Sequence, residues 1–279
     1  METQLQSVLP QIEKTAGPCA VIVFGYNSIN GQSKSAFGFE SVPPHANGHF
    51  YLLVFTNEST NALTNLTDSI SQRSDGKISV TLLQHTLQSL GTKSQDQRWF
   101  FYQALRLGEP VSLGIDVPYL RNYGWVRRDY EGARTHWYKC EAMAGLYLES
   151  AAQSQHLDVE LGKIAFLSQA IEFIALGLIR VFLGYTPNQY GLKFLLALCG
   201  HFTDLPSHCF PIADEVGQKR LKMVCTPPSM LRHWDKLEAP EADFDSLLDA
   251  CTRFFGKSRK LALKHLETLE NLRTKTSIS

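Results

Sequence analysis

The chain has 279 residues, enough for one large domain or two modest ones. With 44% hydrophobic, 11% aromatic and only 19% charged residues, the composition excludes a disordered chain. The 27 Lys and Arg residues balance the 27 Asp and Glu residues. No overall field therefore draws the protein toward nucleic acid or an anionic membrane, and any such binding must be local.

The N-terminal sequence METQLQSVLPQIEK has no positive region followed by an apolar core. It therefore predicts neither a signal peptide nor a transit sequence, and a cytoplasmic location is expected. The six cysteines are scattered, with no C-x-x-C pair and no zinc-finger spacing. This pattern predicts reduced, mostly buried thiols and no metal site.

The first part of the chain predicts a small α/β domain with a mixed sheet. Runs rich in Val, Ile, Leu and aromatic residues predict strands, and apolar residues at helical spacing predict helices. The strands are expected at residues 19–25, 49–55 and 77–83, and the helices at residues 61–73 and 94–108. The polar segment from Tyr26 to Gly48 is predicted to be a loop because it contains consecutive prolines.

A domain boundary is predicted at Ile115–Val126, which contains Pro and Gly and has no sustained periodicity. Residues 1–125 carry 8 basic and 9 acidic side chains, against 19 and 18 in the rest of the chain. The later part is thus richer in charge. We expect one domain over residues 1–120 and a second over residues 121–279.

The apolar spacing in the second domain predicts an antiparallel bundle of at least four helices, so the whole chain is expected to be α+β. Apolar residues at helical spacing place these helices at residues 131–155, 161–183, 188–202 and 243–272. Residues 164–183 are nearly as long as a membrane span, but Gln169, Glu172 and Arg180 interrupt them. This segment is therefore predicted to be the central helix of the bundle and not a membrane helix.

Gln169, Glu172 and Arg180 form one polar stripe along that helix, with Leu176 between them. Buried polar groups must be satisfied. The stripe either pairs with other helices or a second subunit, or it presents an arginine to phosphate with a carboxylate to position it. The sequence leaves both readings open.

One basic region is open to two interpretations, and two further basic runs are given one. Arg127, Arg128 and Arg134 lie among aromatic residues, a composition that suits RNA binding or a clamp at a domain interface. The runs QKRLK (218–222) and KSRKLALKH (257–265) are interpreted as solvated helix faces.

The segment LSQAIEFIALGLIRVFLGYTPNQYGLKFLL, preceded by HWYKCEAMAGLYLESA and followed by LCGHFTDLPSHCFP, resembles the HEPN family of helical bundles. The turn in that family commonly reads G-Y-x-P-x-x-H followed by a leucine. HEPN bundles are often fused to, or encoded beside, a minimal nucleotidyltransferase, and VIVFGYNS and HFYLLVF resemble the first two strands of that domain. The resemblance covers roughly residues 18–210.

The sequence departs from both families at their catalytic positions. Tyr51 and Leu53 stand where a nucleotidyltransferase has its metal-binding carboxylates, and Tyr26 stands at its small phosphate-loop residue. Nucleotide transfer is therefore not expected, and the domain is interpreted as degenerate.

HEPN ribonucleases are similar to one another in an R-x(4–6)-H motif that supports metal-independent RNA cleavage. Arg180 matches the arginine, but Tyr185, Thr186 and Pro187 occupy the permitted histidine spacings, and Tyr190 replaces the histidine of the G-Y-x-P-x-x-H turn. His201 and His208 are the nearby histidines that could substitute.

The resemblance implies a non-catalytic dimer that binds RNA or nucleotide in a regulatory, defence or stress role. Its subunits would pair through the central helices of the bundle. The binding residues would be Gln169, Glu172, Arg180 and Asn188, with Arg180 and Tyr185 lining the cleft.

Two alternatives remain. One is a metal-independent endoribonuclease in which Arg180 stabilises the phosphate, and Tyr185, Tyr190 or a histidine transfers the proton. The other is an adaptor that binds only protein. No cofactor, metal ion, membrane or sequence-specific DNA contact is expected.

Overall fold

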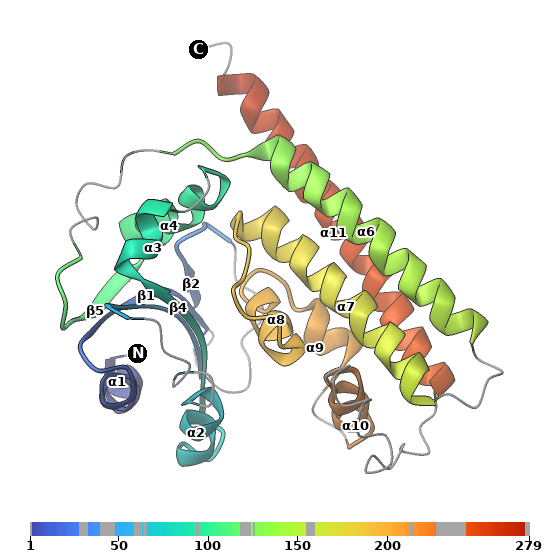
Figure 1. Ribbon diagram of the computed structural model, residues 1–279, viewed down its shortest axis with the longest axis horizontal. Coiled ribbons are helices and arrows are strands. Elements are labelled where there is room, and N and C mark those ends of the chain that lie inside the picture. The colour runs from blue at the N-terminus through green and yellow to red at the C-terminus, as the bar shows by residue number, and fades with distance from the viewer. Residues whose placement is uncertain are drawn as a thin grey trace. The chain divides into compact units, whose positions relative to one another are not determined.

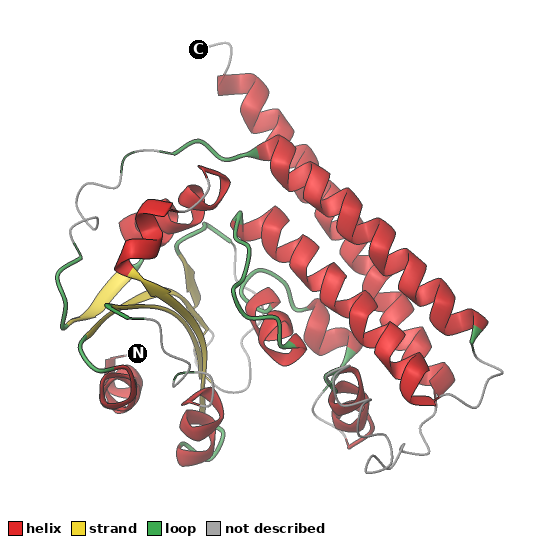
Figure 2. Cartoon of the chain, viewed as in Figure 1, coloured by secondary structure: helices red, strands yellow, loops and turns green. Residues whose placement is uncertain are grey.

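A computed structural model of the protein describes residues 2–27, 33–39, 48–58, 63, 66–92, 95–117, 124, 126–154, 160–211, 215–226 and 244–276. The chain divides into two units, Met1–Arg128 and Asp129–Ser279. The predicted boundary segment, Ile115–Val126, lies just before this division. Among the described residues, every strand belongs to the first unit, and the second unit is helical (Figure 2). The predicted α+β class is confirmed.

The first unit is built on one five-stranded sheet. Its central strands are β1 (Cys19–Asn27), β3 (Gly48–Thr56) and β4 (Ile78–Thr86). β1 is antiparallel to β3, whereas β3 is parallel to β4, so the sheet is mixed as predicted. Nearly every side chain of these strands is buried, which accounts for their continuous apolar runs. The three predicted strands are confirmed.

Two short strands share one edge of β1. β2 (Ser33–Ser35) pairs with its C-terminal end, and β5 (Glu109–Leu113) pairs with its N-terminal part. Both escape prediction, because short edge strands need no alternation of apolar and polar residues. The loop predicted for Tyr26–Gly48 is wrong at Tyr26–Asn27, at β2 and at Gly48. Residues 28–32 and 40–47 of that segment lie outside the described residues.

Helices cover both faces of the sheet (Figure 1). α1 (Glu2–Ala16) and α2 (Leu66–Arg73) share a core with one face, in which Ile12 and Ile70 join Leu52. α4 (Gln95–Leu107) covers the other face, where the Phe100 ring lies 5.6 Å from that of Phe24. α3 (Leu87–Thr92) follows β4 directly. The predicted helices at 61–73 and 94–108 correspond to α2 and α4.

The second unit contains α6 (Tyr130–Gln153), α7 (Glu160–Leu183), α8 (Leu192–Cys199), α9 (Leu205–Cys209), α10 (Glu215–Val224) and α11 (Phe244–Thr276). α6 and α7 run antiparallel beside each other, and α11 packs along both (Figure 1). At the start of α6, the Asp129 carboxylate accepts a hydrogen bond from the backbone N–H of Gly132 at 2.9 Å. This is an N-cap and explains where the helix begins.

α7 is the most enclosed long helix of its unit. Leu161–Leu183 is long and apolar enough to cross a membrane, yet 72% of its apolar window is buried inside the protein. Its Gly177 lies against Trp137 and Cys140 of α6, with space too small for a Cβ atom. The apolar character of α7 is therefore used in packing against its neighbours.

Candidate functional site

The predicted polar stripe begins with a pair of side chains on the half-exposed side of α7. The Gln169 amide donates a hydrogen bond to Glu172 Oε2 at 3.2 Å. Glu172 is half-buried, and this burial raises the pKa of its carboxyl group, although the Gln169 hydrogen bond partly opposes the shift. The carboxylate is therefore partnered within its own helix.

Arg180 lies on the same side of the helix but is buried, with 5% of its surface exposed. Its Nη1 donates a hydrogen bond to the carbonyl oxygen of Gly184 at 3.2 Å. The Gly184 N–H in turn donates to the carbonyl oxygen of Arg180 at 3.0 Å. Gly184 has φ +63°, the left-handed conformation in which glycine commonly ends a helix. Arg180 thus helps to close the C-terminus of α7, where a cation is favourable.

The other predicted site residues lie at very different depths. Tyr185 is fully buried, and this burial raises the pKa of its phenol, although a hydrogen bond with the Asn188 backbone partly opposes the shift. Asn188 and Tyr190 are exposed, Tyr190 by 55%. Burial encloses Arg180 and Tyr185 and leaves Asn188 and Tyr190 at the surface. A buried phenol of raised pKa does not ionise at neutral pH, so Tyr185 is unsuited to act as a base.

The two histidines considered as substitutes also differ. His201 is buried, with 5% of its surface exposed, and burial lowers its pKa to about 3. It is therefore neutral near pH 7 and is part of the core. His208 has a side chain that is 59% exposed on α9.

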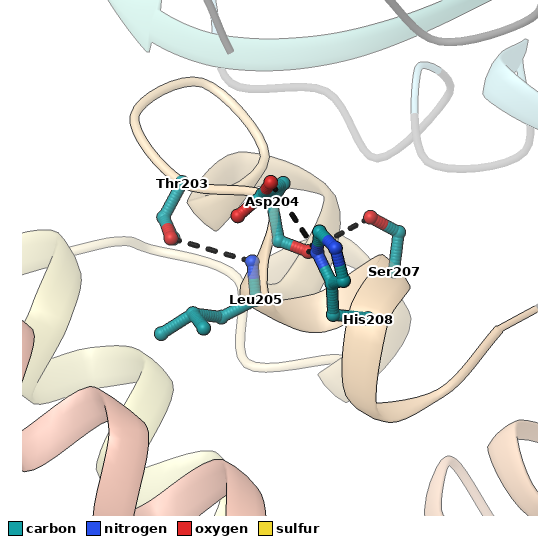
Figure 3. Close-up of polar contacts among 5 residues, drawn as sticks. All are labelled: Thr203, Asp204, Leu205, Ser207 and His208. Atoms are coloured by element: carbon teal, nitrogen blue, oxygen red, sulfur yellow. Dashed lines mark hydrogen bonds and ion pairs between the residues drawn. The ribbon is translucent and has the colours of Figure 1, made fainter. Parts of the chain in front are cut away.

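His208 belongs to a local hydrogen-bonded turn at the start of α9 (Figure 3). Its Nδ1 lies 3.3 Å from the Asp204 carboxylate and 3.2 Å from the Asp204 carbonyl oxygen. Ser207 Oγ donates to the same carbonyl at 2.8 Å, and Thr203 Oγ1 accepts from the Leu205 N–H at 3.3 Å. These contacts organise the turn and orient the imidazole. They do not by themselves build a site for a reacting group.

The sheet face compared with a nucleotidyltransferase site has a different chemistry. Tyr51 and Leu53 are both buried, with 1% and 0% exposed. His49 lies between two hydroxyls of β4, with Nδ1 2.7 Å from Ser79 Oγ and Nε2 2.9 Å from Thr81 Oγ1. Within the described part of the chain, no group of three His, Cys, Asp or Glu side chains could hold a metal ion.

The basic and aromatic region around Arg128 and Arg134 contains two cation–π contacts. The Arg128 guanidinium lies over the Trp99 ring at 4.1 Å, and that of Arg134 lies over the Tyr138 ring at 5.8 Å. Trp137 is fully buried. Trp137 therefore belongs to the core, whereas the Arg134–Tyr138 contact lies at the surface, since Tyr138 is 48% exposed.

Two surfaces of the second unit extend features that the sequence predicted only in part, namely the polar stripe with Gln169 and Glu172 and the solvated face of residues 257–265. The first is a half-exposed stripe on α7, called here the α7 stripe and formed by Ala165, Phe166, Gln169, Glu172, Phe173 and Leu176. The second is a row of exposed cations on α11, called here the α11 row and formed by Arg253, Lys257, Lys260 and Lys264. Their spacings are visible in the sequence, but their exposure depends on how the helices pack.

Comparison with known proteins finds no matching family model, no matching curated protein and no matching solved structure. The functional interpretation therefore depends on the residues of this chain.

Proposed function

We propose that this protein is a non-catalytic, HEPN-like dimer that binds RNA or nucleotide without cleaving it, and that its first unit is a degenerate nucleotidyltransferase-like domain. The observation that supports the absence of catalysis is the burial of Arg180 and Tyr185. The guanidinium is hydrogen-bonded to Gly184, and the phenol is enclosed in the core. A guanidinium that closes a helix end and a phenol enclosed in the core are poorly placed to contact the phosphate of a substrate.

The competing function is metal-independent RNA cleavage. It would require an accessible base and a cation beside the same phosphate. Tyr190 and His208 are accessible, whereas the predicted phosphate ligand Arg180 is not. This difference favours binding over cleavage.

We expect mixed cellular RNA to stay intact when it is incubated with the purified protein in EDTA and examined on a denaturing gel. In the same buffer, RNA or nucleotide should raise the melting temperature of the protein, because a ligand that binds only the folded state stabilises it. Cleavage that is lost in His208→Gln or Tyr190→Phe would instead establish a nuclease. Intact RNA with no thermal shift by either ligand would favour a protein adaptor.

The α7 stripe supports the dimeric part of the proposal. Tyr147 of α6 stacks on Phe173 at 5.9 Å and lies 6.4 Å from the Phe166 ring. All three rings are half-exposed and lie beside the Gln169–Glu172 pair. A partly apolar surface with a few paired polar groups is typical of subunit interfaces. A two-fold axis would place the same stripe on both subunits.

The wild-type protein is expected to have the mass of a dimer in size-exclusion chromatography with light scattering. Phe173→Glu should give a monomer, because it places an unpaired charge at the centre of the apolar surface. Val216→Glu is the matched control, since Val216 is 56% exposed on α10 and lies outside the stripe. If Phe173→Glu remains a dimer, the α7 stripe is not part of the dimer interface.

A further inference from the structure

The α11 row is a straight line of positive charge on one side of the longest helix. Its four members are separated by 4, 3 and 4 residues, so they lie within a narrow arc of a helix with 3.6 residues per turn. From Arg253 to Lys264 the row is about 16 Å long at 1.5 Å per residue. All four side chains are exposed.

The row faces away from the side of α11 that packs against the other helices. That buried side is lined by Leu247, Phe254 and Ala262, each with 0% of its surface exposed. At the N-terminal end of the row, the Phe254 ring lies 5.8 Å from that of Phe210. Phe210 follows α9 directly, so this contact packs the end of α9 against α11 next to Arg253.

On α11 the exposed carboxylates of Asp249 and Glu267 lie beyond the two ends of the row, one turn from Arg253 and from Lys264, and none lies between its members. Within the part of the chain that the structure describes, none of the four side chains forms an ion pair or a hydrogen bond. Other cations of the same unit do form ion pairs. Arg259, on another side of α11, lies 2.6 Å from Glu141, and Lys219 lies 2.9 Å from Glu215. The α11 row therefore has an excess of positive charge in a chain whose net charge is zero.

We infer that the α11 row binds the phosphate backbone of single-stranded RNA. This inference rests on the proposed function and names the surface and the ligand class that serve it. A mononucleotide is too short to engage a row of about 16 Å, whereas a polynucleotide strand presents phosphates along its whole length. The row contains no aromatic side chain, so it contacts phosphates and does not read bases.

Binding to a fluorescent oligouridylate of twelve nucleotides, measured by anisotropy over a salt series, tests the inference. Four phosphate contacts to a single strand predict that log K falls with log salt with a slope of about −3. The triple variant Lys257→Gln/Lys260→Gln/Lys264→Gln should reduce the slope to about −1 and weaken binding about 100-fold at 0.1 M salt. Its melting temperature should stay close to that of the wild type, because the three side chains are exposed.

The matched control is Lys139→Gln/Lys219→Gln/Lys222→Gln, which removes the same charge from exposed positions on α6 and α10. It should keep the wild-type slope and most of the affinity. If both triple variants lose RNA affinity equally, binding depends on the net charge of the protein and not on the α11 row, and the inference is overturned. RNA binding that is unchanged in the α11 variant would overturn the inference that the α11 row binds RNA, but the proposed RNA-binding function would still stand. If the wild type binds anionic vesicles but neither RNA nor nucleotide, both proposals fail.

Discussion

Replacing Trp137 with alanine is expected to lower the free energy of unfolding of the helical unit by about 3–5 kcal/mol, the usual cost of removing a large aromatic side chain from a packed core. Trp137 is fully buried in α6, and its ring lies against Gly177 of α7. Among the residues that the structure describes, the indole N–H has no hydrogen-bond partner, so the expected loss is one of packing. Urea unfolding followed by circular dichroism gives the change.

The reciprocal substitution tests the same contact from the other helix. A Cβ atom at Gly177 would lie 2.9 Å from Trp137 Cε3 and 3.1 Å from Cys140 Cβ. Gly177→Val should therefore cost about 1–3 kcal/mol through overpacking. In the Trp137→Ala background this cost should shrink, because the closest atom is gone and only the Cys140 contact remains. Additive costs in the double variant would contradict the proposed contact.

Gly145→Ala is the matched control for a glycine in a helix. It lies in α6, and a Cβ atom there would meet nothing within 4 Å. Alanine should therefore stabilise the unit by about 0.5–1 kcal/mol, since glycine weakens a helix interior. A gain in stability for Gly145→Ala and a loss for Gly177→Val would show that the loss at position 177 comes from close packing and not from helix propensity.

The strongest apolar patterns in the sequence correspond to the most buried elements of the fold. β1, β3 and β4 are buried on both faces, and the long helices α6, α7 and α11 each have a buried side. Burial imposes an apolar pattern, and such a pattern can be read from the sequence. β2 and β5 pair only at an edge of β1 and bury too little to impose one. α1 has apolar residues at helical spacing but contains Pro10, which argues against a helix from sequence alone.

The candidate site shows a similar limit. Helical spacing correctly predicts that Gln169, Glu172 and Arg180 share one side of α7, because that depends only on the helix period. It does not predict their depth. Gln169 and Glu172 remain half-exposed, whereas Arg180 is buried and bonded to Gly184. Whether a polar side chain lines a cleft or closes a helix end depends on the path of the chain beyond the helix, which spacing does not encode.

The stability of the helical unit is also expected to depend on pH through His201. Burial lowers the pKa of this imidazole to about 3 in the folded protein, against 6.5 for an ordinary histidine. Between these values the unfolded state binds a proton and the folded state does not. Stability therefore falls as the pH drops below about 6.5 and continues to fall toward about 3. Between pH 7 and pH 5 the expected loss is about 2 kcal/mol.

His201→Gln isolates this contribution, because a glutamine does not titrate. Urea unfolding at pH 7 and pH 5 should show a smaller loss in the variant than in the wild type, even if the variant is less stable at pH 7. Subtracting the pH dependence of the variant from that of the wild type removes the contributions of all other titrating groups. One of these is Glu172, whose raised pKa makes the folded state more stable as the pH falls, the opposite of the effect of His201. An equal pH dependence in the wild type and His201→Gln would mean that His201 is accessible to protons in the folded state, contrary to its burial among the helices.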